Sequence, residues 1–175
     1  MLSFDGIKKK LISQSKYPDF LRKKGAVIGE DCEIYKSANF GSEPYLITIG
    51  NHVRINGGVQ LVTHDGGYWV LRDRKAGYEE KFRNADRFGR ITIHDNVHIG
   101  TNAIIMPGVD IGENCIIACG AVVTHNVPSN MVFGGIPAKC IETLDEYASK
   151  AQKRYVNTKH MSMKAKKKYL LKEIF

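Results

Sequence analysis

The sequence predicts a mainly β fold in which short strands stack as a coil. From Ile93 onward, aliphatic residues recur every six positions: Ile93, Ile99, Ile105, Ile111, Ile117 and Val123. The residue four places after each of these is small or of modest size: Val97, Ala103, Val109, Cys115, Ala121 and Val127. A period of six matches no helix face, which returns every ~3.6 residues, but it is a multiple of the strand period.

Each six-residue unit is interpreted as a short strand followed by a turn. The aliphatic side chain points inward and stacks on its equivalent in the next coil, while glycine and asparagine allow the corner conformations. One unit cannot bury its apolar side alone, so stability must come from stacking. The same frame begins earlier, at Ile28 and Ile49. An antiparallel sandwich is the alternative, and six consecutive matches to one frame disfavour it.

Composition narrows the class of protein. The 175 residues suit one domain, and 43% hydrophobic with 25% charged residues is typical of a folded soluble chain. No apolar run reaches the ~20 residues of a membrane span, and the N-terminus does not resemble a signal peptide. Four cysteines without a pairing pattern indicate a reducing compartment, so we expect a cytoplasmic protein whose cysteines are small buried residues.

Positive charge is concentrated at the two ends of the chain. Residues 1–25 hold seven Lys/Arg and two Asp/Glu, residues 26–140 hold ten and twelve, and residues 141–175 hold nine and four. A nucleic-acid-binding domain would carry its basic residues on the folded body, so no nucleic-acid partner is expected. The lysine run at 164–168 is typical of a solvated face, with contact to an anionic membrane surface or an acidic polymer as the alternative.

Two kinds of segment depart from the six-residue frame. Residues 63–90 are rich in charge, aromatics and glycine, and they predict one long projecting loop, a feature that is more often functional than decorative. Both ends predict helices that cap the coil. We therefore expect a single domain over 1–175, with an N-terminal helical cap at 1–25, a coil at 26–141 and a C-terminal helix at 142–175. The N-terminal cap is predicted from Leu2, Phe4, Ile7, Leu11 and Ile12.

Four stretches of the coil together resemble a known family. They are Thr63–Asp65, Val97–Gly100, Ile105–Asn114, and last Gly120–Thr124 followed by Asn126–Asn130 and Gly135–Lys139. In combination they are similar to the hexapeptide-repeat acyltransferases, in the branch of maltose, galactoside and polysaccharide O-acetyltransferases. The resemblance implies a left-handed parallel β-helix, a homotrimer with active sites between subunits, acetyl-CoA as donor, and a hydroxyl of a sugar, polysaccharide or lipopolysaccharide precursor as acceptor.

Three alternative functions stay open. An N-acetyltransferase acting on an amino-sugar nucleotide and a xenobiotic acetyltransferase would have the same fold. A non-catalytic solenoid would have kept the coils and lost the chemistry. The presence of His64 and of the long loop disfavours this last alternative.

His64 is the candidate general base. It lies where the coil gives way to the loop and matches the catalytic histidine of the family. A neutral imidazole can accept the hydroxyl proton as the thioester is attacked, because its usual pKa of ~6.5 is close to working pH. A metal site would need three or four converging ligands, and no such cluster is present in the sequence, so no metal is expected.

The resemblance also assigns binding residues. Matching the family motif places five residues beside CoA: Thr101, Cys119, Thr124, His125 and Lys139. A cation such as Lys139 suits the CoA phosphates, because charge-assisted hydrogen bonds hold phosphate well. Candidate acceptor-binding residues are Asn39, Asp65, Trp69 and Arg72. The family often has proline after the histidine where this chain has Asp65, which favours a polysaccharide-type acceptor.

Overall fold

The computed structural model describes residues 11–174, and it divides into two compact units, one ending at Leu144 and one beginning at Asp145. The expected cap residues Leu2, Phe4 and Ile7 lie outside the described part of the chain. The first unit opens with η1 (Gln14–Lys16) and α2 (Tyr17–Lys23).

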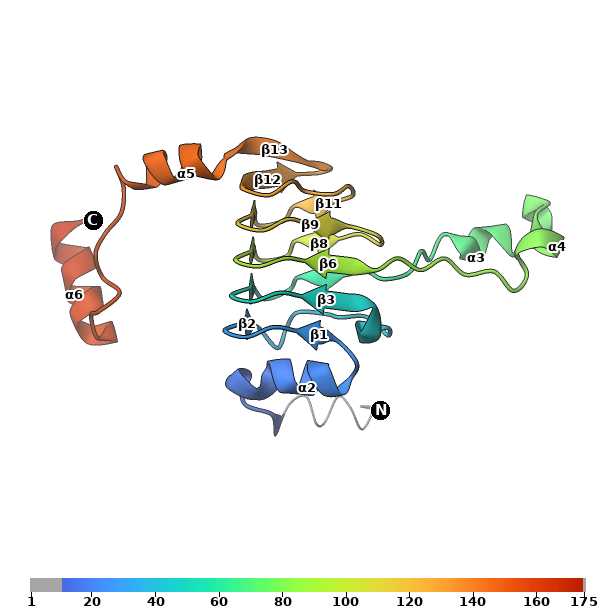
Figure 1. The fold of residues 1–175 in the computed structure, drawn as a ribbon, viewed down its shortest axis with the longest axis horizontal. Helices are drawn as coiled ribbons and strands as arrows, with labels where there is room; N and C mark the ends of the chain where they lie inside the picture. The colour runs from blue at the N-terminus through green and yellow to red at the C-terminus, as the bar shows by residue number, and fades with distance from the viewer. Residues whose placement is uncertain (1–10, 175) are drawn as a thin grey trace. The chain divides into compact units, whose positions relative to one another are not determined.

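Most of the rest of the first unit is a stack of short strands in three sheets, parallel except for the last strand (Figure 1). The first sheet holds β1 (Val27–Ile28), β3 (Ile47–Ile49), β6 (Ile91–Ile93) and β9 (Asp110–Ile111). The second holds β2 (Glu33–Ile34), β4 (Arg54–Ile55), β7 (His98–Ile99), β10 (Ile116–Ile117), β12 (Met131–Gly135) and β13 (Ala138–Thr143). The third holds β5 (Gln60–Leu61), β8 (Ile104–Ile105) and β11 (Val122–Val123). The mainly β, parallel-stranded fold expected from the repeats is confirmed.

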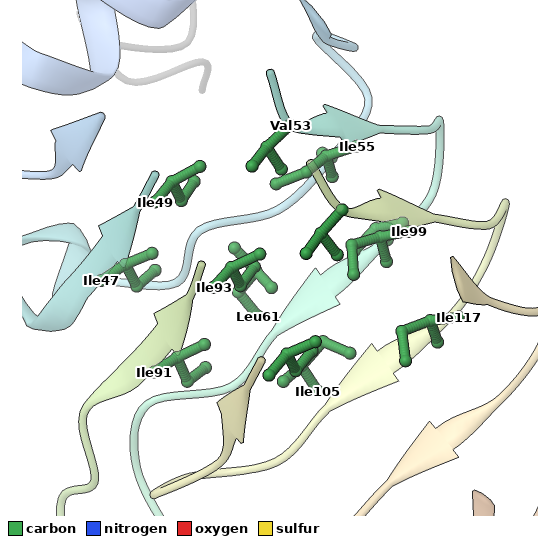
Figure 2. Close-up of a cluster of buried hydrophobic side chains, with 14 of the residues drawn as sticks. Ile47, Ile49, Val53, Ile55, Leu61, Ile91, Ile93, Ile99, Ile105 and Ile117 are labelled. Carbon is green, nitrogen blue, oxygen red and sulfur yellow. The ribbon is translucent and has the colours of Figure 1, made fainter. Parts of the chain in front are cut away.

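The aliphatic ladders of the repeat form the core, as Figure 2 shows. Along the second sheet, Ile55 pairs with Ile99 and Ile99 pairs with Ile117. All three side chains are fully shielded from solvent, at 0% exposure. Burying an aliphatic side chain of this size stabilises the folded state by about 1.5–3 kcal/mol. The six-residue frame therefore identified the inward-facing residues correctly, and stacking between coils supplies the stability.

One corner of the coil is fixed by a column of polar residues in the left-handed backbone region. Asn96, Asn114 and Asn130 have φ values of 56°, 56° and 64°. Asparagine tolerates this conformation better than most residues, and its amide can also hydrogen-bond locally. Asn96 Nδ2 donates to Asn114 Oδ1 at 2.8 Å, and Asn114 Nδ2 donates to Asn130 Oδ1 at 3.0 Å. The corner asparagines thus support one another from coil to coil.

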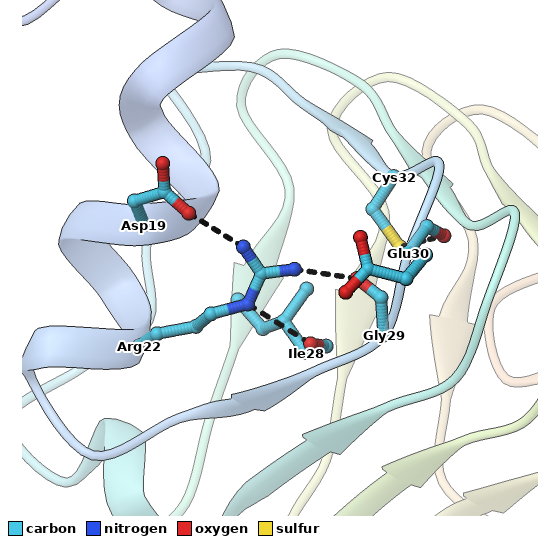
Figure 3. A network of polar contacts seen from close by, with 6 residues as sticks. All are labelled: Asp19, Arg22, Ile28, Gly29, Glu30 and Cys32. Atoms are coloured by element: carbon cyan, nitrogen blue, oxygen red, sulfur yellow. Dashed lines mark hydrogen bonds and ion pairs between the residues drawn. The ribbon is translucent and has the colours of Figure 1, made fainter.

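The two ends of the stack are closed in different ways. At the first coil, Arg22 of α2 donates from Nε to the Ile28 carbonyl at 3.0 Å and from Nη2 to the Gly29 carbonyl at 2.6 Å (Figure 3). Arg22 Nη1 also contacts Asp19 Oδ1 at 2.6 Å. At the last coil, β13 pairs antiparallel with β12. Both the Arg22 side chain and the strand β13 form hydrogen bonds with backbone groups that an open sheet edge would leave unpaired.

The C-terminal region differs from the single helix expected over 142–175. It contains β13, then α5 (Leu144–Ala151), and then α6 (Met163–Glu173), with residues 152–162 between the two helices. The physical reason lies in the hairpin: β12 needs an edge partner, so residues through Thr143 extend as a strand before helix begins.

The cysteines also differ from expectation in part. Cys115 is buried and Cys32 is half-buried, whereas Cys119 and Cys140 are exposed. Cys119 occupies a corner after β10, and Cys140 lies on the edge strand β13. Only a cysteine at an inward position of the frame is shielded by the coils above and below it.

Candidate active site

An insertion of residues 64–90 separates β5 from β6 and contains α3 (Tyr68–Leu71), η3 (Arg74–Ala76) and α4 (Glu79–Phe82). The two ends of the insertion are joined where they leave the coil. His64 and Phe88 form an antiparallel bridge, and Gly89 N donates to the Thr63 carbonyl at 2.8 Å. Backbone pairing on both sides therefore fixes His64, although it lies at the start of a loop.

A carboxylate orients the His64 ring. Nδ1 of His64 lies 3.2 Å from Oε2 of Glu43, and the same oxygen accepts a 2.8 Å hydrogen bond from Thr63 Oγ1. The Glu43 side chain is only 14% exposed, while that of His64 is 49% exposed. Hydrogen bonds from the Ser42 and Thr63 side chains hold the pKa of Glu43 below its usual value. An ionised Glu43 accepts a proton-bearing Nδ1, which leaves Nε2 of His64 as the basic nitrogen.

His64 lines a pocket of about 330 Å³. Its other lining residues come from the coil and from both ends of the insertion: Val62, Asp65, Gly66, Arg87, Met106, Pro107 and Thr124. The pocket therefore brings three of the sequence-predicted residues together, namely His64, Asp65 and Thr124. A histidine with one oriented nitrogen at the edge of a pocket is suited to remove a proton from a bound hydroxyl.

Of the three acceptor-side candidates on the loop, Asp65 belongs to that pocket lining, whereas Trp69 and Arg72 lie apart from it. Asp65 Oδ1 accepts a hydrogen bond from Gly67 N at 2.9 Å, so it also shapes the turn into the loop. Trp69 is 78% exposed on α3. Arg72 donates to the Ala85 carbonyl at 2.7 Å and is ion-paired with Asp86, so it joins the outgoing and returning segments of the loop.

Asn39 lies beside the third sheet, in the first coil. It bridges to Gln60 of β5, the strand that leads to His64. Its Nδ2 donates to Gln60 Oε1 at 2.9 Å, and its Oδ1 accepts from Gly41 N at 3.0 Å. Both ends of the amide thus have a partner within the chain.

The predicted CoA-binding residues form two neighbouring pairs and one separate residue. Thr101 and Cys119 lie on adjacent corners, where Gly120 N donates to the Thr101 carbonyl at 2.8 Å. A Cβ at Gly100 would come within 2.5 Å of the Cys119 nitrogen, so glycine is required for this close approach. Thr124 Oγ1 and His125 Nδ1 share a 2.9 Å hydrogen bond.

Lys139 is the separate residue. It lies exposed at the start of β13, opposite Gly134 of β12. It is placed after the last complete coil, on the chain segment that follows the Ile136–Pro137 bond. An exposed ammonium in this position is available for an anionic group.

Glu43 was not predicted from the sequence. It precedes η2 (Pro44–Leu46), a short insertion in the corner that leads to the second coil. The available signal was a skip in the frame, since Phe40 follows Ile34 by six residues but Ile49 follows Phe40 by nine. Such a skip marks an insertion, but it does not reveal that the inserted carboxylate reaches His64.

Within residues 11–174, no group of three or more His, Cys, Asp or Glu side chains is arranged to hold a metal ion. The same described residues contain no helix of sufficient length and apolarity to cross a bilayer.

Comparisons with known proteins agree with the fold and with the repeats. The family described as bacterial transferase hexapeptide (six repeats) matches residues 90–125. The chain is 44% identical to protein CapG of Staphylococcus aureus over 164 residues, which covers 93% of this chain and 91% of that protein. It is 35% identical to galactoside O-acetyltransferase of Escherichia coli over 106 residues, which is 59% of this chain and 47% of that enzyme.

A solved structure of galactoside acetyltransferase in complex with coenzyme A shares the fold, with a TM-score of 0.57. The match is 24% identical and covers 82% of this chain and 78% of that one. Together with the near-complete match to CapG, these likenesses define the class of protein. The chain belongs to the hexapeptide-repeat acyltransferase family, in the branch that includes O-acetyltransferases, and it is an acyltransferase.

Proposed function

We propose that this protein transfers an acetyl group from acetyl-CoA to a hydroxyl group of a sugar, polysaccharide or lipopolysaccharide precursor. The observation that carries the proposal is the contact between His64 and Glu43 at the edge of the pocket. The solved galactoside acetyltransferase contains coenzyme A, which supports acetyl-CoA as the donor here. The reaction would take place in the cytoplasm, where acetyl-CoA is made.

The proposed chemistry is a direct transfer. As the acceptor oxygen attacks the thioester carbonyl, the hydroxyl proton passes to Nε2 of His64. Glu43 then faces the charged imidazolium across the 3.2 Å contact and stabilises it. When the tetrahedral intermediate collapses, the carbon–sulfur bond breaks and the CoA sulfur leaves, taking up the proton that His64 holds. Atoms and charge therefore balance with no further reactant.

Glu43 acts here as a positioning residue. A histidine without an orienting partner spreads its neutral form over two tautomers and several ring orientations. Because Glu43 accepts from both Nδ1 of His64 and Oγ1 of Thr63, it fixes the ring against the end of β5. The wrong tautomer would present a proton, rather than a lone pair, to the acceptor hydroxyl.

The donor would occupy the corners and strands beyond the pocket. Thr124 lines the pocket with His64 and contacts His125, while Thr101 and Cys119 adjoin each other on the preceding corner. In this proposal, Thr101 and Cys119 line the pantetheine arm, and Thr124 and His125 follow toward the nucleotide. Lys139 would meet the CoA phosphates, for which a cation is the natural partner.

The acceptor would be held by the insertion and by the third sheet. Asp65 lines the pocket beside His64, and Trp69 offers an exposed aromatic surface of the kind that covers a sugar ring. Arg72 would contribute by holding the loop that carries Trp69. Asn39 would contact the acceptor from the first coil.

We further propose a left-handed coil assembled as a homotrimer, with each site completed by a neighbouring subunit. The half-buried, outward-facing Ile104 and Val122 of the third sheet support a covered face beside the pocket. Light scattering after size exclusion would measure the mass of the assembly, and a monomer would contradict this part of the proposal.

The function is tested by an acceptor screen. Purified protein is incubated with acetyl-CoA and pooled sugars, glycans and nucleotide sugars, and CoA release is followed by thiol detection and mass spectrometry. We expect a product heavier by one acetyl group on oxygen, formed ~10²–10⁴-fold more slowly by the His64→Ala variant. Acetylation only of amines would replace this proposal with an N-acetyltransferase. Absence of transfer to every acceptor, with intact folding, would favour a non-catalytic solenoid.

A further inference from the structure

The C-terminal unit has no apolar core of its own. No residue of α5 or α6 is buried, and between residues 145 and 174 only Thr158 is shielded from solvent. The start of α6 is set by local chemistry, since Ser162 Oγ accepts a hydrogen bond from Ala165 N at 3.3 Å. An isolated helix of about this length is only marginally stable in water, because nucleation is unfavourable and a short helix forms few hydrogen bonds to offset it. A surface that covers α6 would therefore stabilise it.

One side of α6, continued by its C-cap residue Ile174, carries an apolar stripe in which Met163 and Ile174 are exposed and Leu170 is half-buried. Met163, Leu170 and Ile174 are spaced by seven and four residues, so they project from the same side of a helix. Met163 is 85% exposed and Ile174 is 43% exposed. Lys166 and Lys167 follow Met163 by three and four residues and lie on the two flanks of the stripe. Such lysines can lay their aliphatic stems beside apolar groups while the ammonium extends to phosphate.

The charge of this unit is strongly positive. Residues 145–174 contain nine Lys/Arg and three Asp/Glu, whereas the coil region 26–140 contains ten and twelve. Of the five lysines on α6, the structure gives an ion pair within the described residues only to Lys172, which contacts Glu173 at 3.2 Å. The adjoining positive charges at 164–168 therefore repel one another and attract an anionic surface.

We propose that α6 is a docking element for an anionic lipid bilayer and lies in the plane of the headgroups. The apolar stripe would enter the boundary with the acyl chains, and the flanking lysines would meet lipid phosphates. A second copy of this unit is a poorer occupant, because it would bring the same positive charge. An acidic polymer would satisfy the lysines but would leave Met163 and Ile174 in water. This inference is independent of the acetyl-transfer proposal.

The first test is sedimentation of the full chain with vesicles. We expect binding to phosphatidylglycerol–phosphatidylcholine vesicles, weak binding to pure phosphatidylcholine, and loss of binding as salt is raised. The variant K164Q/K166Q/K167Q/K168Q should lower partitioning by roughly 10²–10³-fold. Glutamine keeps the helix propensity of lysine, so circular dichroism should change little. The matched control K23Q/K24Q/K75Q/K81Q removes the same charge from exposed positions elsewhere and should retain binding.

The second test separates lipid from the other occupants. The variant M163S/I174S should weaken vesicle binding by ~10-fold or more while leaving any binding to heparin unchanged. Only a lipid bilayer offers the apolar side chains an apolar environment. Equal binding to both vesicle types, or an equal loss in the lysine control, would overturn the proposal. Binding to heparin without binding to vesicles would assign the lysines to an acidic polymer. A changed assembly mass in K164Q/K166Q/K167Q/K168Q would assign α6 to a contact between copies.

Discussion

The coils and the insertion at 64–90 are stabilised by different interactions. In the coils, an inward aliphatic residue of each strand is almost fully shielded, and hydrogen-bonded corners repeat from one coil to the next. In the insertion, no residue is buried. Its order comes from ion pairs such as Arg72 with Asp86, from Arg74 and Arg83 around Glu79, and from edge-to-face contacts of Phe82 with its aromatic neighbours.

Because of this difference, the coils supply the stability of the fold, and the proposed chemistry lies where the insertion joins the coil. Exposed ion pairs contribute about 0–1 kcal/mol each, whereas a buried aliphatic side chain contributes several times more. The coil can therefore hold His64 and Glu43 in place while the insertion varies in sequence and conformation. Substitutions in the core should unfold the protein, and substitutions at the junction with the insertion should remove activity without unfolding it.

The largest effect should come from the junction. His64→Ala should lower kcat by ~10²–10⁴-fold, as expected for loss of a general base. The melting temperature should change little, because the side chain is about half exposed. Steady-state kinetics and thermal unfolding measure the two quantities. His94→Ala, a similarly exposed histidine on another corner, is the control and should keep wild-type activity. Retention of more than about a tenth of kcat would show that His64 is not the base.

The core should respond in the opposite way. Ile117→Ala should lower the free energy of unfolding by about 2–5 kcal/mol, because it removes buried methyl groups and leaves a cavity. The control is Ile116→Ala, since the neighbouring residue points outward and is half-buried. Urea unfolding at equal protein concentrations compares the two. If both variants lost the same stability, the inward and outward positions would not differ as the repeat predicts.

Glu43 connects the coil with the insertion. It lies at a corner of the coil, and its carboxylate contacts His64 at the start of the insertion. Glu43→Gln should lower kcat by ~10–10²-fold, since a neutral amide can no longer stabilise the imidazolium. KM for acetyl-CoA should hardly change. The pH profile of kcat should shift as well, which a purely structural role would not cause. Glu43→Asp should restore part of the rate. An unchanged profile in Glu43→Gln would remove Glu43 from the positioning role.

A smaller effect is expected at the far end of the coil. Lys139→Glu should raise KM for acetyl-CoA by ~10-fold with kcat near wild type, because a remote phosphate contact contributes to binding in both the ground and transition states. Lys139→Arg keeps the charge and should behave nearly as wild type. Kinetics at several salt concentrations would measure the charge dependence. A KM that stays at the wild-type value in Lys139→Glu would place the phosphates elsewhere.

The smallest effect concerns acid stability. Burial, with the nearby Arg54 charge as a second cause, holds the pKa of His98 below 6.5. The unfolded chain therefore takes up this proton more readily, so His98 costs stability as pH falls below about 6.5 and costs nothing above it. Melting temperatures between pH 7 and pH 5 should fall less steeply in His98→Gln than in wild type. His160→Gln controls for the loss of an exposed histidine, and parallel curves for all three proteins would contradict the expected linkage.

Much of the fold was predictable from the sequence because the repeat is short and regular. Ile93, Ile99 and Ile105 could be identified as buried from spacing alone, since stacking imposes the same environment on every coil. The position of the insertion followed from the break in the frame. The late start of the C-terminal helical region was not predictable in this way, because the edge of β12 takes residues through Thr143 as its partner.

The sequence by itself determined the parallel-stranded coil, its inward residues and the candidacy of His64. Only the tertiary structure decided which group orients that histidine, because Glu43 lies 21 residues earlier and meets His64 through the pairing of adjacent coils. The same holds for the pocket that joins His64 with Thr124 from a later coil. The physical reason is that a repeat specifies which residues stack on one another within each ladder. The contacts of an insertion depend instead on the direction in which the chain leaves the coil at that corner.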